Sequence, residues 1–275
     1  IYGAKPVFYI DNNKNDIFLI SGAGLLFKFN SEDLDKDQIK LFNIKTNLIE
    51  IINDEQFYHN PYLSIKDIFI DNNYIFLSYS KKSKDNCYNT SILRGEINES
   101  NIKFNIFFDP DECSQKNPTS GGGRIVKFNN DNIFFTIGDF FDWKKPQNKK
   151  SIFGKIILLN LKNKKYKTVS MGHRNQQGLT FLKNKNVLIE TEHGPKGGDE
   201  VNLIDLSKNQ EINNFGWPIS SYGVHYDGKK SKIAPLHKSH KDHGFIEPIL
   251  HFTPSIGISE IRNVDIFFNE DKNYN

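Results

Sequence analysis

The feature that most constrains the fold is a unit of strand, tight turn and strand that recurs four times. Its copies are VFYIDNNKNDIFLIS, DIFIDNNYIFLSYS, RIVKFNNDNIFFTIGD and LTFLKNKNVLIETEHG, each rich in β-branched and aromatic residues around an Asn- or Lys-containing turn. The turns, near Asp11, Asp71, Asn129 and Lys183, are separated by 60, 58 and 54 residues. A third strand follows each hairpin, as LLFKFN, SILRGEI, KIILLNL and EVNLIDL. Several strands repeated at this period predict an all-β fold, the β-propeller.

The repeat is interrupted once and then resumes. A long loop insertion occupies about residues 207–247, before a strand-like ILHF at Ile249. The final NVDIFFNEDKNYN has the pattern of the first hairpin of a fifth unit. We therefore expect residues 1–275 to form a single propeller domain, present as an incomplete ring of about four and a half blades, because a closed ring leaves no sheet edge open.

Composition narrows the possible partners. With 37% hydrophobic and 25% charged residues among 275, the chain is typical of a globular protein. A net charge of +3 favours neither nucleic acid nor a membrane surface as partner, and no run approaches the roughly 20 apolar residues of a membrane span. Cys87 and Cys113 fit either two free thiols or one disulfide in an exported protein. The chain opens on Ile1, which leaves open a signal peptide that was removed or lies outside the sequence.

Two polar segments stand at the starts of predicted inner strands. In SGGGR, three consecutive glycines permit either a β-bulge or a close approach of the backbone to a bulky group. In GHRNQQGL, a cation and several amides are crowded together, which suits a planar acidic ligand that an arginine can stack on or fork around. The alternative for GHRNQQGL is a hydrogen-bond network between blades. The polar residues concerned are His173, Arg174, Asn175 and Gln177.

A third segment, ETEHGPKGGDEVNL, is rich in oxygen ligands. It lacks the Gly-Lys-Ser/Thr order of a phosphate loop and the spacing of an EF-hand. The backbone carbonyls of Gly194 and Pro195 are free to point into a pocket, and acids flank them at Glu192, Asp199 and Glu200. Hard oxygen ligands of this kind suit calcium.

Three histidines in the insertion, His237, His240 and His243, have a spacing that could hold zinc. They lie in a lysine-rich loop where no predicted strand or helix would fix their geometry. The sequence therefore favours a solvated surface turn over a metal site.

Seven strings together resemble one family. They are GGRIVKF, TIGD, GKIILLNL, GHRNQQGL, ETEHGPKGGDEVNL, NNFGWP and EPILHFTPSIGISEI, in family order between Gly122 and Ile261. In these strings the chain resembles the soluble PQQ-dependent sugar dehydrogenases, also called glucose/sorbosone or aldose sugar dehydrogenases. The resemblance implies a six-bladed propeller, periplasmic or secreted, that binds pyrroloquinoline quinone (PQQ) with calcium over its axis. It also implies oxidation of a small aldose sugar at C1, with electrons passing to an acceptor that the sequence does not identify.

The resemblance assigns roles to particular positions. The positions matching the family's PQQ contacts are Arg174 and Asn175, with Gln177 close behind and His193 beside the quinone. The backbone carbonyls of Gly194 and Pro195 match the calcium ligands.

One catalytic position departs from the family. Two residues ahead of the first glycine of GGR, the family has a histidine, the base that removes the sugar hydroxyl proton, and this chain has Ser120. A serine hydroxyl is not a base near neutral pH unless another group activates it. Two hypotheses follow: a PQQ- and calcium-dependent dehydrogenase with a different base, or a non-catalytic propeller that binds a sugar or a partner protein.

Overall fold

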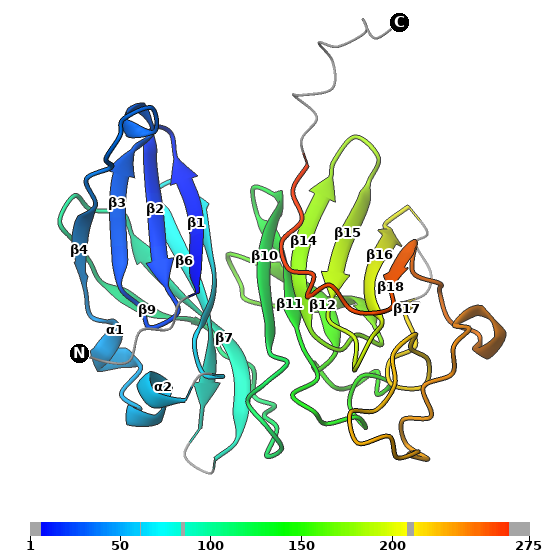
Figure 1. Ribbon diagram of the computed structural model, residues 1–275. Helices are drawn as coiled ribbons and strands as arrows, with labels where there is room; N and C mark the ends of the chain where they lie inside the picture. Colours follow the sequence, from blue (N-terminus) through cyan, green and yellow to red (C-terminus); the bar gives the residue numbers. More distant parts are fainter. Residues whose placement is uncertain (1–6, 61, 84–85, 208–211, 264–275) are drawn as a thin grey trace, which may run out of the picture.

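The computed structural model describes residues 7–60, 62–83, 86–207 and 212–263. Four sheets stand side by side, each with four consecutive antiparallel strands in meander order (Figure 1). The first is β1 (Phe8–Asn13), β2 (Asp16–Ser21), β3 (Leu26–Asn30) and β4 (Phe42–Thr46). The second is β5 (Ile65–Asp71), β6 (Tyr74–Lys82), β7 (Tyr88–Glu96) and β9 (Phe104–Phe108). The third is β10 (Gly122–Asn129), β11 (Asn132–Ile137), β12 (Lys155–Asn160) and β13 (Tyr166–Met171), and the fourth is β14 (Gln176–Leu182), β15 (Val187–Glu192), β16 (Asp199–Asp205) and β18 (Leu250–Phe252).

Two short strands join neighbouring blades. β8 (Asn101–Ile102) leaves the second blade and pairs in parallel with β4 of the first. β17 (Asn213–Asn214) comes from the insertion and pairs in parallel with β13 of the third. Helices are few: α1 (Leu48–Ile51) and α2 (Glu55–His59) connect the first blade to the second, and single 3₁₀ turns cover Ser31–Asp33 and Lys241–His243. Within the described ranges, no helix has the length and apolar character needed to cross a membrane.

The propeller predicted from the sequence is confirmed, with all four hairpins and all four third strands at the expected places. The blade count needs a correction, since the described residues form four blades and not four and a half. The predicted fifth hairpin lies in residues 264–275, outside the described residues. The segment that leads to it forms no strand; instead, the carbonyl of Ser259 accepts a hydrogen bond from the Thr191 hydroxyl at 2.6 Å.

The core lies between blades. Alternate side chains of a strand point to opposite faces, so neighbours in sequence enter different clusters. On β6, Leu77 packs between the first and second blades, while Phe76 packs between the second and third. On β11, Phe135 belongs to the cluster shared with the second blade and Phe134 to the one shared with the fourth. This two-sided burial explains why the inner strands are nearly continuous apolar runs.

An arginine ties the blades together near the axis, where the first strands β1, β5, β10 and β14 lie next to one another in that order. Arg124 of β10 pairs with Asp67 of β5 at 3.2 Å and with Glu260 at 2.9 Å, and its guanidinium lies 5.1 Å from the ring centre of Tyr9 of β1. Its Nε also donates to the carbonyl of Gln177 of β14, so residues from all four blades and the segment after β18 meet at one buried cation.

The two cysteines form a disulfide. Cys87, the residue before β7, is bonded to Cys113 in the loop that leads to Ser120. Beside the bond, Tyr88 and Ser114 exchange two backbone hydrogen bonds of 2.8 Å. The bridge therefore anchors the loop that carries Ser120 to the second blade.

Replacing both cysteines, as Cys87→Ser with Cys113→Ser, is expected to lower the free energy of unfolding by about 3 kcal/mol, because the bridge closes a loop of 26 residues in the unfolded chain. Urea unfolding measures the loss. A reducing agent should destabilise the native protein by a similar amount and leave the double variant unchanged. Two titratable thiols in the denatured, unreduced native protein would contradict the bridge.

Candidate functional site

Three segments that are far apart in sequence meet at Asn175. Its side-chain oxygen accepts hydrogen bonds from the backbone N–H of Gly122 at 3.2 Å and from the side-chain amide of Gln177 at 3.0 Å. Its backbone carbonyl accepts the N–H of His193 at 3.1 Å. The structure thus brings SGGGR, GHRNQQGL and EHGP together at the ends of β10, β14 and β15, as the sequence-based site requires.

The glycine run makes a bulge. The register of β10 against β11 shifts between Gly122 and Ile125, and Gly122 and Gly123 adopt φ of 63° and 115°. A Cβ on Gly123 would lie 2.4 Å from the Cβ of Lys66. Both interpretations of the glycines therefore hold, although the group that approaches is the protein's own backbone and side chains. Ser120, at φ 58° and 8% exposed, accepts a hydrogen bond from the N–H of Phe140 through its carbonyl.

Arg174 is bracketed by two aromatic rings. Its guanidinium lies 5.3 Å from the ring centre of Phe141 and 5.5 Å from that of Trp217, distances typical of cation–π contacts. One guanidinium N–H donates to the carbonyl of His193 at 2.9 Å. The two rings and the hydrogen bond hold the guanidinium in a fixed plane. The sequence did not assign a role to either ring, although TIGD ends two residues before Phe141 and NNFGWP contains Trp217.

The buried carboxylate of Glu192 holds the GHRN loop in place through hydrogen bonds. One oxygen of Glu192 accepts the backbone N–H groups of Arg174 and Asn175, and the other lies 3.1 Å from Nδ1 of His173. Nε2 of His173 lies 2.8 Å from the hydroxyl of Ser170. His173 is fully buried, so it belongs to the inter-blade network and not to a ligand surface.

The network continues to Glu190 and Asn202. The Asn202 amide donates to Glu190 at 2.8 Å and to Glu192 at 3.1 Å, while Glu190 lies 3.2 Å from Nδ1 of His173. In the part of the chain that the structure describes, His173, Glu190 and Glu192 are the one group of three side chains that could together hold a metal. Their mutual hydrogen bonds and a shared proton explain the cluster without an ion.

The charges in this network are set by burial and by one another. Burial disfavours a charge on His173, but the carboxylates of Glu192 and Glu190 outweigh it and raise the pKa of His173 to about 9. Burial, and next the charge of Glu192, raises the pKa of Glu190 to about 8. Burial also opposes ionisation of Glu192, yet His173 and the two N–H donors hold its pKa below the ordinary value. Glu192 is therefore the ionised acid, and Glu190 is neutral near pH 7.

The loop after Glu192 presents backbone oxygens. Gly194 and Pro195 are buried, and no hydrogen bond among the described residues ends on either carbonyl. A Cβ on Gly194 would lie 2.0 Å from the carbonyl oxygen of Gly198, so only glycine fits there. Asp199 stabilises the turn, since its carboxylate accepts the N–H of Gly194 at 3.2 Å and of Gly257 at 2.9 Å.

Glu200 and the histidines of the insertion contact other groups of the protein. Glu200 pairs with His240 at 3.4 Å, and His240 also bonds to the carbonyl of Phe215 at 2.7 Å. His237 and His243 stack on each other with ring centres 3.8 Å apart. The three histidines are therefore not gathered as a zinc site. The prediction of a solvated turn was wrong for His240, which is 1% exposed, because the insertion folds back onto β16.

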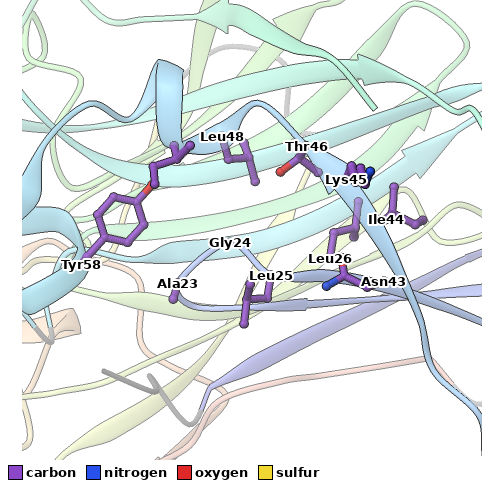
Figure 2. A pocket seen from close by; sticks show the side chains of 11 residues that line it. Ala23, Gly24, Leu25, Leu26, Asn43, Ile44, Lys45, Thr46, Leu48 and Tyr58 are labelled. Carbon is purple, nitrogen blue, oxygen red and sulfur yellow. The ribbon is translucent and has the colours of Figure 1, made fainter. Parts of the chain in front are cut away.

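An apolar hollow of about 380 Å³ lies elsewhere, on the first blade (Figure 2). It is formed by the turn before β3, by β4 and by α1, with Leu25, Leu48 and Tyr58 among its walls. None of the candidate site residues contributes to it, so the hollow is separate from the site.

Comparison with known proteins identifies the family and the fold. Residues 63–267 match the family model described as Glucose / Sorbosone dehydrogenase. The chain is 27% identical over 219 residues to aldose sugar dehydrogenase YliI of Escherichia coli, covering 74% of this chain and 56% of that protein, so it spans about half the length of the curated relatives it matches.

Two solved structures are similar in fold. One is the soluble aldose sugar dehydrogenase of Escherichia coli in the apo form, with a TM-score of 0.70 at 21% identity, covering 94% of this chain and 76% of that one. The other is the PQQ-bound aldose sugar dehydrogenase of Streptomyces coelicolor, with a TM-score of 0.60 at 17% identity, covering 88% and 66%. At these identities the similarity establishes the fold alone.

The buried network predicts how stability depends on pH. The folded state holds a proton on His173 up to about pH 9 and one on Glu190 up to about pH 8, whereas the unfolded chain releases them near 6.5 and 4.5. Raised pKa values stabilise the fold below the unfolded value and lose that effect as pH rises, so these two protons should lower the free energy of unfolding as the pH rises from 6.5 to 8. Each such proton contributes about 1.4 kcal/mol per pH unit.

Urea unfolding at several pH values tests this. The side chain of Glu190→Gln is neutral at every pH. This variant should therefore lose one proton's contribution to the slope of the free energy of unfolding against pH. Glu50→Gln, at an exposed position of α1, serves as the matched control and should leave it unchanged. An unchanged slope in Glu190→Gln would mean that Glu190 is already ionised in the folded protein.

Proposed function

Since the chain belongs to the glucose/sorbosone dehydrogenase family, we propose that it binds PQQ with calcium and oxidises a small aldose sugar. The observation that carries the proposal is the junction at Asn175, where the segments matching the family's PQQ and calcium positions meet in one place. A PQQ-bound structure among the proteins of similar fold supports the choice of cofactor.

The donor set fits both groups. PQQ is a flat tri-acid, and Arg174 offers a cation of fixed plane beside the amides of Asn175 and Gln177. Calcium prefers oxygen ligands, and among the described residues no hydrogen bond ends on the carbonyls of Gly194 and Pro195, two buried residues. The carbonyl of a buried residue is normally paired, so two consecutive carbonyls without a recorded donor would suit a cation.

The proposed roles follow from these positions. When bound, PQQ supplies the acceptor for the two electrons that leave the sugar as hydride. Arg174 and Asn175 bind and orient its acidic groups, and Gln177 supports Asn175 through their mutual hydrogen bond. The carbonyls of Gly194 and Pro195 would bind calcium next to these PQQ-binding residues. The base for the sugar hydroxyl proton is left unassigned, because Ser120 lacks the basicity to take it; His193, half-buried beside Asn175, is the nearest histidine in the sequence.

The second candidate function is a non-catalytic propeller that binds a sugar or a partner protein, and Ser120 is the observation that favours it. For either function we propose a periplasmic or secreted location. The Cys87–Cys113 bridge supports export, since such bonds persist in oxidising compartments.

Binding is the first test. The protein should bind PQQ with calcium present and lose it on chelation, measured by cofactor absorbance after gel filtration. Arg174→Ala should weaken binding about 10- to 100-fold, the range expected for losing charge-assisted hydrogen bonds. The matched control is Arg94→Ala, which removes another ring-stacked arginine, at an exposed position of β7 in the second blade. No PQQ binding at any calcium concentration would leave only the non-catalytic hypothesis.

Turnover is the second test. Sugar oxidation should be slow in the native protein and rise by on the order of 10² or more in Ser120→His, because a positioned base supplies the proton transfer. Histidine is among the residues that tolerate the positive φ found there. Ser120→Ala is the control and should keep the native rate. Rapid native turnover that His193→Ala abolishes would instead assign the base to His193.

A further inference from the structure

One buried carboxylate contacts everything that brackets Arg174. Asp139 follows β11 and accepts the indole N–H of Trp217 on one oxygen at 2.7 Å. Its other oxygen accepts the backbone N–H of Phe141 at 2.9 Å, and its own N–H donates to the carbonyl of Arg174 at 2.8 Å. The Trp217 ring, the backbone of Phe141 and the backbone of Arg174 are thus all hydrogen-bonded to one residue.

The sequence alone does not bring these groups together. Trp217 lies 78 residues after Asp139, inside the insertion, and reaches the third blade because β17 pairs with β13. Asp139 is 1% exposed, so its charge must be compensated inside the protein. Burial raises the pKa of Asp139 to about 6, while the positive charge of Arg174 and the two hydrogen bonds act to lower it. Near neutral pH the carboxylate is ionised and has two donors with strict directions.

We propose that Asp139 is a positioning residue: its carboxylate fixes the Trp217 indole and the Phe141 backbone, and through these rings it sets the plane of Arg174 for an acidic ligand. The inference deepens the proposed function and rests on it for the ligand. Arg174 alone has rotamer freedom that a rigid bracket removes before binding, and such preorganisation raises affinity.

Substitution with asparagine isolates this role. In asparagine an NH2 donor replaces one of the two carboxylate oxygens, so either the indole N–H of Trp217 or the backbone N–H of Phe141 loses its acceptor. Removing a buried negative charge near Arg174 would, by electrostatics alone, strengthen binding of an anion. A purely electrostatic role of Asp139 therefore predicts tighter anion binding in Asp139→Asn, and a positioning role predicts weaker binding.

The first measurement needs no ligand. The chain has two tryptophans, so in Trp143→Phe the indole of Trp217 is the sole emitter. Adding Asp139→Asn should shift its emission and increase quenching by iodide at least twofold, because the buried indole loses its fixed partner. Circular dichroism of both proteins checks that the fold is retained. Identical emission and quenching in the two proteins would overturn the inference.

The second measurement is PQQ affinity in the presence of calcium. Asp139→Asn should weaken binding about tenfold, and Trp217→Phe, which keeps a ring but removes the N–H, should do the same in a protein with a native Asp139. If both act through one contact, the double variant should be no weaker than about tenfold, whereas independent roles would give about a hundredfold.

The outcomes separate the two claims. Unchanged or tighter binding in Asp139→Asn, with a changed Trp217 signal, would overturn the link to Arg174. Should Asp139→Asn fail to fold, Trp217→Phe decides, since unchanged affinity there contradicts the inference. A protein that binds no PQQ contradicts the proposed function, and the fluorescence result still decides whether Asp139 orders Trp217.

Discussion

The ionised carboxylate of Glu192 is the interaction on which the candidate site depends. It accepts the N–H groups of two successive residues, Arg174 and Asn175, and pairs with His173 below them. Asn175, held in this way, bonds to the backbone of Gly122 and of His193. A single buried charge on β15 therefore fixes the starts of β10 and β14 and the loop that follows β15 itself.

Such a charge is stable only with complete compensation. His173 supplies the opposite charge and Asn202 donates a further hydrogen bond, while Glu190 stays protonated and avoids a second negative charge. The same principle recurs at Arg124, which two acids compensate near the axis, and at Asp139. Each buried ion bonds to residues from more than one blade or from the insertion, so compensation of charge also joins parts that apolar packing alone would leave free to slide.

Much of the fold could be predicted because the sequence repeats its pattern locally. Hairpins such as DIFIDNNYIFLSYS carry their strands and their turn within fifteen residues, and apolar runs such as NIFFTI indicate burial on both faces. The proposed roles of Arg174 and Gly194 come from a family resemblance in short strings and stay predictions. The bracket around Arg174 did not, since Phe141 and Trp217 look like ordinary core aromatics and meet only after β17 joins the third blade. His240 was misjudged for the same reason: its partner, Glu200, lies 40 residues away on another element.

A crystal structure of the protein with calcium and PQQ tests the central claim most directly. We expect calcium about 2.3–2.6 Å from the carbonyl oxygens of both Gly194 and Pro195, the distance range of its oxygen ligands. A PQQ carboxylate should lie against Arg174, with the hydrogen bonds of Glu192 to the GHRN loop unchanged. Calcium bound instead by the carboxylates of Glu190 and Glu192, with the GHRN loop displaced, would contradict the account.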